Sequence, residues 1–133
     1  MARILVVDDE PDIVRAVVRI MRACGYDVDT ARDGQMAIDQ VALDAPDLII
    51  IDLALPRLNG QEVCERLKSQ PATQGIPVVM MTSSYLGLDD MPPASPQRAD
   101  GYLIKPFSKR DLLHVTERLL AGHAALDDRP TER

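Results

Sequence analysis

The feature that most constrains this chain is the alternation of short apolar runs with longer amphipathic stretches. Three runs, Ile4–Val7, Leu48–Ile51 and Val78–Met81, are apolar throughout and have the length of a strand. Such runs are typical of central strands that are buried on both faces of a parallel sheet. A shorter run, Tyr102–Ile104, predicts a further strand. Tyr26–Thr30 alternates polar and apolar residues, so we expect it to be a less buried edge strand.

Between these runs, four stretches repeat apolar residues every three or four positions, which is the period of a helix with one buried face. They cover Pro11–Cys24, Gln35–Leu43, Gln61–Lys68 and Ser108–Leu120. In the last stretch Ser108 and Asp111 have the spacing of a capping box, so we expect the helix to begin there. Gly25 and Gly122 follow the first and last stretches and are expected to end those helices.

Strand and helix alternate about five times, which predicts an α/β fold with a parallel sheet covered by helices on both faces. The length of 133 residues suits one domain. We place this domain at residues 1–121. Residues 122–133 are polar and include Pro130, so we expect a tail or the start of a linker.

The fourth helix of this pattern falls between Met81 and Gly101, in a stretch that contains Pro92, Pro93 and Pro96. A proline inside a helix costs about 3 kcal/mol, because it removes a hydrogen bond and clashes with the preceding turn. We therefore expect this helix to be shortened or irregular, with at most a short helix that begins near Pro92 or Pro93.

Charge and hydropathy disfavour several classes of function. The net charge of −6 argues against direct binding of nucleic acid, whose phosphate backbone requires a basic surface. No run approaches the roughly eighteen apolar residues of a membrane span, and Ile4–Val7 is too short for a signal peptide. We expect a cytoplasmic protein. Cys24 and Cys64 lie in helical apolar patterns and are expected to be buried free thiols.

Polar side chains follow the predicted strands at the points where those strands end. These residues are Asp8 and Asp9 after the first run, Asp52 after the second, Thr82 after the third and Lys105 after the last. The carboxyl ends of parallel strands share one rim of the sheet, where ligands bind. The sequence thus predicts a pocket with three carboxylates, a hydroxyl and an ammonium.

This set of groups suits phosphoryl transfer. Three clustered carboxylates repel one another, and a divalent cation removes that conflict. Oxygen ligands favour Mg²⁺, with Mn²⁺ also possible. Lys105 and Thr82 could contact phosphoryl oxygens, and an aspartate can act as the nucleophile. Each residue alone has an ordinary explanation, such as a helix cap or a turn, so the functional interpretation depends on their coincidence.

Four motifs resemble those of the response-regulator receiver domains of two-component signalling, from about Arg3 to Leu120. They are Val6-Val7-Asp8-Asp9-Glu10, Asp52-Leu53-Ala54-Leu55-Pro56 with Asn59-Gly60, Met81-Thr82-Ser83, and Gly101-Tyr102-Leu103-Ile104-Lys105-Pro106-Phe107. The resemblance implies a flavodoxin-like three-layer sandwich whose five parallel strands have the order 2-1-3-4-5. This order agrees with an edge position for Tyr26–Thr30.

The resemblance also implies a role for each acidic residue. Asp52 would be the phosphoacceptor. Asp9 and Asp52 would bind Mg²⁺ directly, together with the backbone carbonyl of Ala54. Asp8 would act mainly through a metal-bound water.

The remaining implied roles concern the phosphoryl group. Thr82 would bind it and move toward it on activation, and Lys105 would pair with its oxygens. Tyr102 would be an aromatic switch that turns inward when Thr82 moves. The Lys105–Pro106 peptide bond is expected to be cis, which proline permits.

The implied activity is that of a signalling switch, not an enzyme, which assists its own phosphorylation and dephosphorylation. The phosphoryl group would come from a phosphohistidine on a sensor histidine kinase or a histidine phosphotransfer protein. The switched partner would be a downstream protein target or an output domain outside this chain. We expect a monomer or a weak dimer, because the prolines between Tyr85 and Arg98 disturb the surface through which the family usually signals.

Two other functions remain open at this point. A phosphatase of the haloacid-dehalogenase type also uses an aspartate nucleophile and Mg²⁺, but it requires a second acid at the position that Ala54 occupies. A pseudo-receiver, an interaction module that is never phosphorylated, would not need the acidic pocket, and the unusual fourth helix keeps this alternative open.

Overall fold

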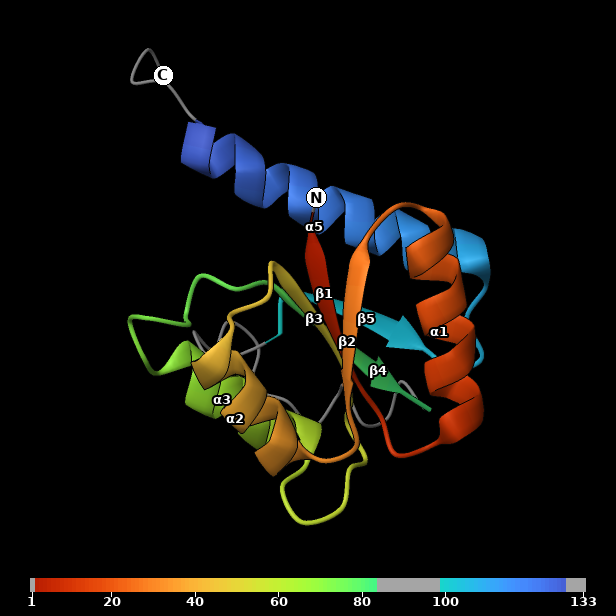
Figure 1. Cartoon of the computed structure of the whole chain (residues 1–133), viewed down its shortest axis with the longest axis horizontal. Coiled ribbons are helices and arrows are strands. Elements are labelled where there is room, and N and C mark those ends of the chain that lie inside the picture. Colours follow the sequence, from red (N-terminus) through yellow and green to blue (C-terminus); the bar gives the residue numbers. More distant parts are fainter. Residues whose placement is uncertain (1, 84–98, 129–133) are drawn as a thin grey trace.

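The computed structural model describes residues 2–83 and 99–128. Five parallel strands form one sheet in the order β2-β1-β3-β4-β5 (Figure 1). The strands are β1 (Arg3–Val7), β2 (Asp27–Ala31), β3 (Leu48–Asp52), β4 (Val78–Thr82) and β5 (Gly101–Ile104). The predicted α/β fold class and strand order are therefore confirmed.

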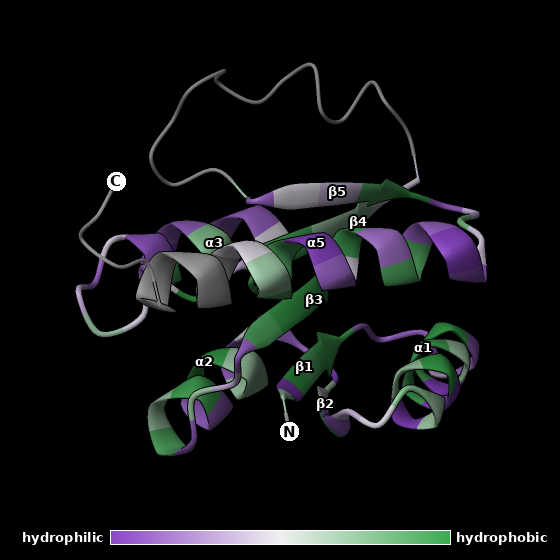
Figure 2. Ribbon diagram, turned by 90° about the horizontal axis from the view of Figure 1, so that it is seen from above, coloured by the Kyte–Doolittle hydropathy of each residue, from purple (hydrophilic) through white to green (hydrophobic). Residues whose placement is uncertain are grey.

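Helices cover both faces of the sheet and complete a three-layer sandwich (Figure 2). They are α1 (Pro11–Ala23), α2 (Gly34–Leu43), α3 (Gly60–Lys68) and α5 (Lys109–Asp128). One apolar cluster joins the sheet to α2 and α3, and a second joins its other face to α1 and α5. The predicted irregular helix near Pro92 lies outside the described residues.

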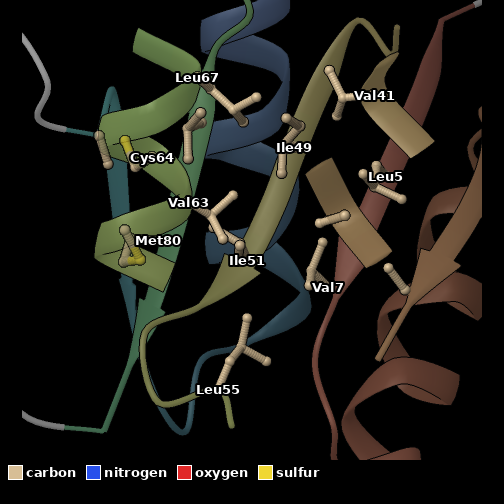
Figure 3. Packing of buried hydrophobic residues seen from close by; sticks show 14 of the residues in the cluster. Leu5, Val7, Val41, Ile49, Ile51, Leu55, Val63, Cys64, Leu67 and Met80 are labelled. Atoms are coloured by element: carbon tan, nitrogen blue, oxygen red, sulfur yellow. The ribbon is translucent and has the colours of Figure 1, made fainter. Parts of the chain in front are cut away.

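The central strands β1, β3 and β4 are buried along almost their whole length. Successive side chains of a strand point to opposite faces. Leu5, Ile49 and Met80 accordingly lie in the cluster with α2 and α3 (Figure 3), whereas Ile4 and Ile50 lie in the cluster with α1 and α5. Because both faces are covered, these strands are apolar throughout instead of alternating.

The edge strand β2 differs from the central strands in sequence and in burial. It pairs with β1, and Asp27, Asp29 and Thr30 are exposed while Val28 and Ala31 are buried. The alternating pattern therefore predicted an edge strand correctly, although β2 begins one residue later than Tyr26.

The last helix begins as predicted but ends later. Asp111 N–H donates to Ser108 Oγ at 3.0 Å and Ser108 N–H donates to Asp111 Oδ2 at 3.3 Å, which confirms the capping box. The predicted end at Gly122 is wrong, because α5 continues to Asp128. A glycine in a helix costs only about 1 kcal/mol relative to alanine, and the sequence around it is rich in alanine. Residues 122–128 are thus helical, and the tail or linker assignment of residues 122–133 stays a prediction.

The two cysteines are both thiols but lie in different surroundings. Cys64 is buried as predicted, and burial raises the pKa of its thiol to about 11. The prediction for Cys24 is wrong, because this residue is exposed. It occupies the C-cap position of α1, one residue beyond the helix, where the apolar face has already ended.

Candidate functional site

Strand ends bring the predicted site residues to one rim of the sheet. These residues are Asp8 after β1, Asp52 at the end of β3, Thr82 at the end of β4 and Lys105 after β5. Lys105 N–H donates to the Thr82 carbonyl at 2.7 Å and so extends the pairing of β4 with β5 into the pocket. The backbone hydrogen bonds of the sheet therefore fix the backbone positions from which these side chains extend.

The Lys105 ammonium lies among three carboxylates. Its Nζ is 3.2 Å from Asp8 Oδ2, 3.2 Å from Glu10 Oε1 and 3.4 Å from Asp52 Oδ2. The side chains of Asp8 and Asp52 are almost inaccessible, at 0% and 7% exposed, whereas that of Glu10 is 61% exposed. Two carboxylates thus form the floor of the pocket and the third lies at its open side.

Backbone groups orient the two buried carboxylates. Glu10 N–H donates to Asp8 Oδ1 at 2.9 Å, and Ala54 N–H donates to Asp52 Oδ1 at 3.4 Å. The second oxygen of each carboxylate faces Lys105. In each aspartate, one carboxylate oxygen therefore accepts a backbone hydrogen bond and the other contacts the ammonium.

Burial and charge shift the pKa values of two groups in the pocket. Burial raises the pKa of Asp8 above its ordinary 3.8, and the charge of Asp52 adds to this, although Glu10 N–H and Lys105 oppose it. Burial by itself would lower the pKa of Lys105, but the charges of Asp52 and Asp8 outweigh it and raise the pKa above 10.5. Lys105 is therefore charged at neutral pH.

The carboxylates could hold a divalent cation. Within the part of the chain that the structure describes, oxygens of Asp8, Glu10 and Asp52 lie within 4.8 Å of one another. Such an all-oxygen set fits Mg²⁺ or Mn²⁺. Asp9 is exposed and is not a member of this group. Direct ligation by Asp9 and by the Ala54 carbonyl, and the water-mediated role of Asp8, stay predictions.

Glu10 is the pocket residue that sequence reasoning missed. It belongs to the Asp8-Asp9-Glu10 motif, but it does not lie at the end of a strand, which is the feature that marks Asp8, Asp52, Thr82 and Lys105. A usable signal exists, because an acidic residue directly before Pro11 occupies the N-cap of α1 and so lies on the same turn as Asp8.

Gly60 allows α3 to approach the end of β3, which carries Asp52. Its N–H donates to the Leu53 carbonyl at 3.0 Å. A Cβ at this position would lie 2.4 Å from the Asp52 carbonyl oxygen and 2.8 Å from Met80 Sδ, which no side chain tolerates. A glycine is required here because of this close approach, and it fixes the backbone that carries Asp52.

The loop between β3 and α3 contains a strained residue. Arg57 has a φ of 66°, in the left-handed region that favours glycine. Its guanidinium is 80% exposed and 4.0 Å from Asp33 Oδ2, so this ion pair offsets little of the cost. The loop beside Asp52 thus holds a backbone conformation that its sequence disfavours.

The remaining predicted residues lie on or beside β5. Tyr102 is half-buried and packs against the cluster of α2 and α3. Thr82 is buried, at 4% exposed. The peptide bond between Lys105 and Pro106 is cis, as the resemblance implies. The switching roles of Thr82 and Tyr102 stay predictions.

Comparison with known proteins agrees with this geometry. The family model of the response regulator receiver domain matches residues 4–117. Protein Rrf1 of Nitratidesulfovibrio vulgaris is 38% identical over 123 residues, which cover 92% of this chain and 86% of that protein. The alkaline phosphatase synthesis transcriptional regulatory protein PhoP of Bacillus subtilis is 40% identical over 116 residues, which cover 83% of this chain and 45% of PhoP.

A solved structure shows the same fold. The chemotaxis response regulator CheY4 of Vibrio cholerae matches with a TM-score of 0.77 and 30% identity, and the match covers 90% of this chain and 98% of CheY4. The chain therefore belongs to the response regulator receiver domain family. It spans about half the length of several curated relatives that it matches. Among the described helices, none is long and apolar enough to cross a membrane.

Proposed function

We propose that this domain is a phosphoacceptor, with Asp52 as the residue that is phosphorylated. The observation that carries the proposal is the arrangement around Lys105, whose ammonium lies 3.4 Å from Asp52 Oδ2 in a pocket floored by two buried carboxylates. This supports the proposal, because an oxygen of Asp52 lies next to a cation that can pair with the oxygens of an incoming phosphoryl group.

The proposed reaction begins with a phosphohistidine on a sensor histidine kinase or a histidine phosphotransfer protein. An oxygen of Asp52 attacks phosphorus, the P–N bond breaks and a P–O bond forms. The imidazole, protonated on its other nitrogen, leaves as neutral histidine. Lys105 pairs with a phosphoryl oxygen and Thr82 donates a hydrogen bond to another. A bound Mg²⁺, held by carboxylates of this pocket, would neutralise charge that gathers on the phosphoryl oxygens.

The proposed output is a change of surface that a downstream protein or an output domain recognises. The acyl phosphate adds charge at the end of β3, next to Thr82 of β4, so it biases Thr82 and Tyr102 between two positions. We further propose a cytoplasmic location, a monomer or weak dimer, and no direct contact with nucleic acid, in keeping with the net charge of −6.

The test is direct phosphorylation in solution. The protein is incubated with phosphoramidate and Mg²⁺, and the intact mass of the wild type is compared with that of Asp52→Asn. We expect a single phosphoryl adduct on the wild type and none on the variant. An unmodified wild type under these conditions would favour a pseudo-receiver, and adduct on Asp52→Asn would place the acceptor elsewhere.

A further inference from the structure

The side chain of Glu10 contacts the pocket, although its position in the sequence would equally allow it to cap helix α1. It is the N-cap residue of α1, yet its side chain makes no capping hydrogen bond to that helix. Its carboxylate instead accepts a hydrogen bond from the Lys105 ammonium at 3.2 Å. The side chain therefore serves the pocket and not the start of its own helix.

Three residues form a closed ring of polar contacts. Glu10 N–H donates to Asp8 Oδ1 at 2.9 Å, Lys105 donates to Asp8 Oδ2 at 3.2 Å, and Lys105 also donates to Glu10 Oε1 at 3.2 Å. Lys105 lies in addition 3.4 Å from Asp52 Oδ2. Lys105 thus contacts three carboxylates, two of them through hydrogen bonds.

We propose that Glu10 is a positioning residue that restrains Lys105 in the resting pocket and so slows phosphorylation of Asp52. Lys105 must turn toward a phosphoryl oxygen during the transfer, and that movement breaks its contact with Glu10. The effect is regulatory and modest, because a pair with one partner 61% exposed is weak. This inference rests on the proposed phosphorylation of Asp52 and describes how the same site is restrained.

Two substitutions distinguish the effect of the contact between Glu10 and Lys105 from the effect of the negative charge of Glu10. Glu10→Asp keeps the negative charge at the open side of the pocket, but it shortens the side chain by one methylene, so the carboxylate no longer reaches Lys105. Aspartate is also a favoured N-cap, so the variant is expected to fold. Glu10→Gln keeps the reach but removes the charge. Glu65→Asp, on the exposed face of α3, controls for shortening an acidic side chain elsewhere.

The rate of phosphorylation by phosphoramidate gives the first readout. Asp52 attacks phosphorus, the P–N bond of the donor breaks, and its protonated nitrogen leaves as ammonia. Releasing one exposed ion pair should raise the rate of Glu10→Asp by about two- to fivefold over the wild type, with Glu65→Asp unchanged. A wild-type rate in Glu10→Asp together with a faster Glu10→Gln would mean that Glu10 acts by repelling the anionic donor, which overturns the proposal.

The second readout needs no phosphorylation. In Mg²⁺-free protein, the ¹⁵N-labelled Lys105 ammonium is observed by NMR, and its proton exchange reports how firmly it is held. We expect faster exchange in Glu10→Asp than in the wild type, and equal exchange would refute the restraint. If the wild type is never phosphorylated, the proposed function fails while this measurement still decides whether Glu10 restrains Lys105.

Discussion

Two lysines lie at opposite ends of the strands, and their ammonium groups have different surroundings. Lys105 lies at the carboxyl edge, 15% exposed, and contacts three carboxylates at 3.2 to 3.4 Å. Lys68 lies at the other edge, 7% exposed, and its ammonium donates to Asp100 Oδ2 at 2.7 Å and to the Ile76 and Gln74 carbonyls at 2.8 and 3.2 Å. Both ammonium groups are surrounded by oxygens. Lys68 contacts two neutral carbonyls and one carboxylate, whereas the contacts of the Lys105 ammonium with the described residues given above are all with carboxylates.

The difference fits a structural role for Lys68 and the proposed functional role of Lys105. Asp100 Oδ2 also accepts from Val78 N–H at 2.8 Å, so the Lys68 pair joins the end of α3 to the starts of β4 and β5 with short hydrogen bonds. Around Lys105 the negative charges outnumber the ammonium, the contacts are longer, and a cation or phosphoryl group can replace them. The first arrangement is complete without a ligand, whereas the second has excess charge that a ligand can balance.

The largest expected effect on stability comes from breaking the Lys68 pair. Lys68→Met removes the donor from two carbonyls and leaves Asp100 with a single backbone partner, so we expect the free energy of unfolding to fall by about 3 kcal/mol. Denaturant unfolding measures this, with Lys109→Met, an exposed lysine on α5, as the control. Phosphorylation of the folded variant should match the wild type, and a large loss of phosphorylation would remove the distinction between the two lysines.

Lys105→Met should act mainly on phosphorylation. We expect phosphorylation by phosphoramidate to slow by about 100-fold, because the phosphoryl oxygens lose their cation. Mg²⁺ should raise the Tm of the variant more than that of the wild type, since no ammonium competes for the carboxylates. A smaller Mg²⁺ shift in the variant would contradict this competition.

We expect pH to have a weaker effect on the free energy of unfolding, through Asp8 at the carboxyl end of β1. Because the pKa of Asp8 is raised on folding, mainly by burial, the folded protein holds this proton more firmly than the unfolded chain. The contribution of Asp8 to stability is therefore greatest at low pH and declines as the pH rises above 3.8 through the folded pKa. Unfolding of wild type and Asp8→Asn over this range, without Mg²⁺, should show the variant gaining relative stability as pH rises. Parallel curves would show that Asp8 contributes no pH dependence.

The smallest expected effect on stability concerns the backbone strain at Arg57, in the loop beside Asp52. Arg57→Gly should raise the free energy of unfolding by roughly 0.5 to 1 kcal/mol, because glycine adopts a positive φ without steric cost. Thermal or denaturant unfolding measures the gain. Arg57→Ala retains the strained backbone and should not be stabilised, so equal gains in both variants would assign the effect to the Arg57 side chain instead.

The sequence predicted the fold and most of the site because both follow from local patterns. Continuous apolar runs marked strands covered on both faces, and the residue after each run marked the rim. Asp8, Asp52, Thr82 and Lys105 were found in this way, since the ends of parallel strands must converge.

What the sequence did not reveal depends on contacts between distant segments or on side-chain reach. Lys68 and Asp100 are 32 positions apart and meet only once β4 and β5 are paired. The contact of Glu10 with Lys105 depends on the length of both side chains, which no spacing rule encodes. The end of α5 was misjudged because Gly122 is a weak stop when helix-forming residues follow it.

The exposed carboxylates of β2 have a consequence for the protein in a crowded solution. β2 is an edge strand of the sheet, and an edge strand can pair with a strand of another molecule. Asp27 and Asp29 stand exposed along its five residues, so a second copy approaching edge to edge would place like charges side by side and lose the hydration of both. The same residues that mark β2 as an edge in the sequence thus help to keep the sheet from growing beyond one molecule.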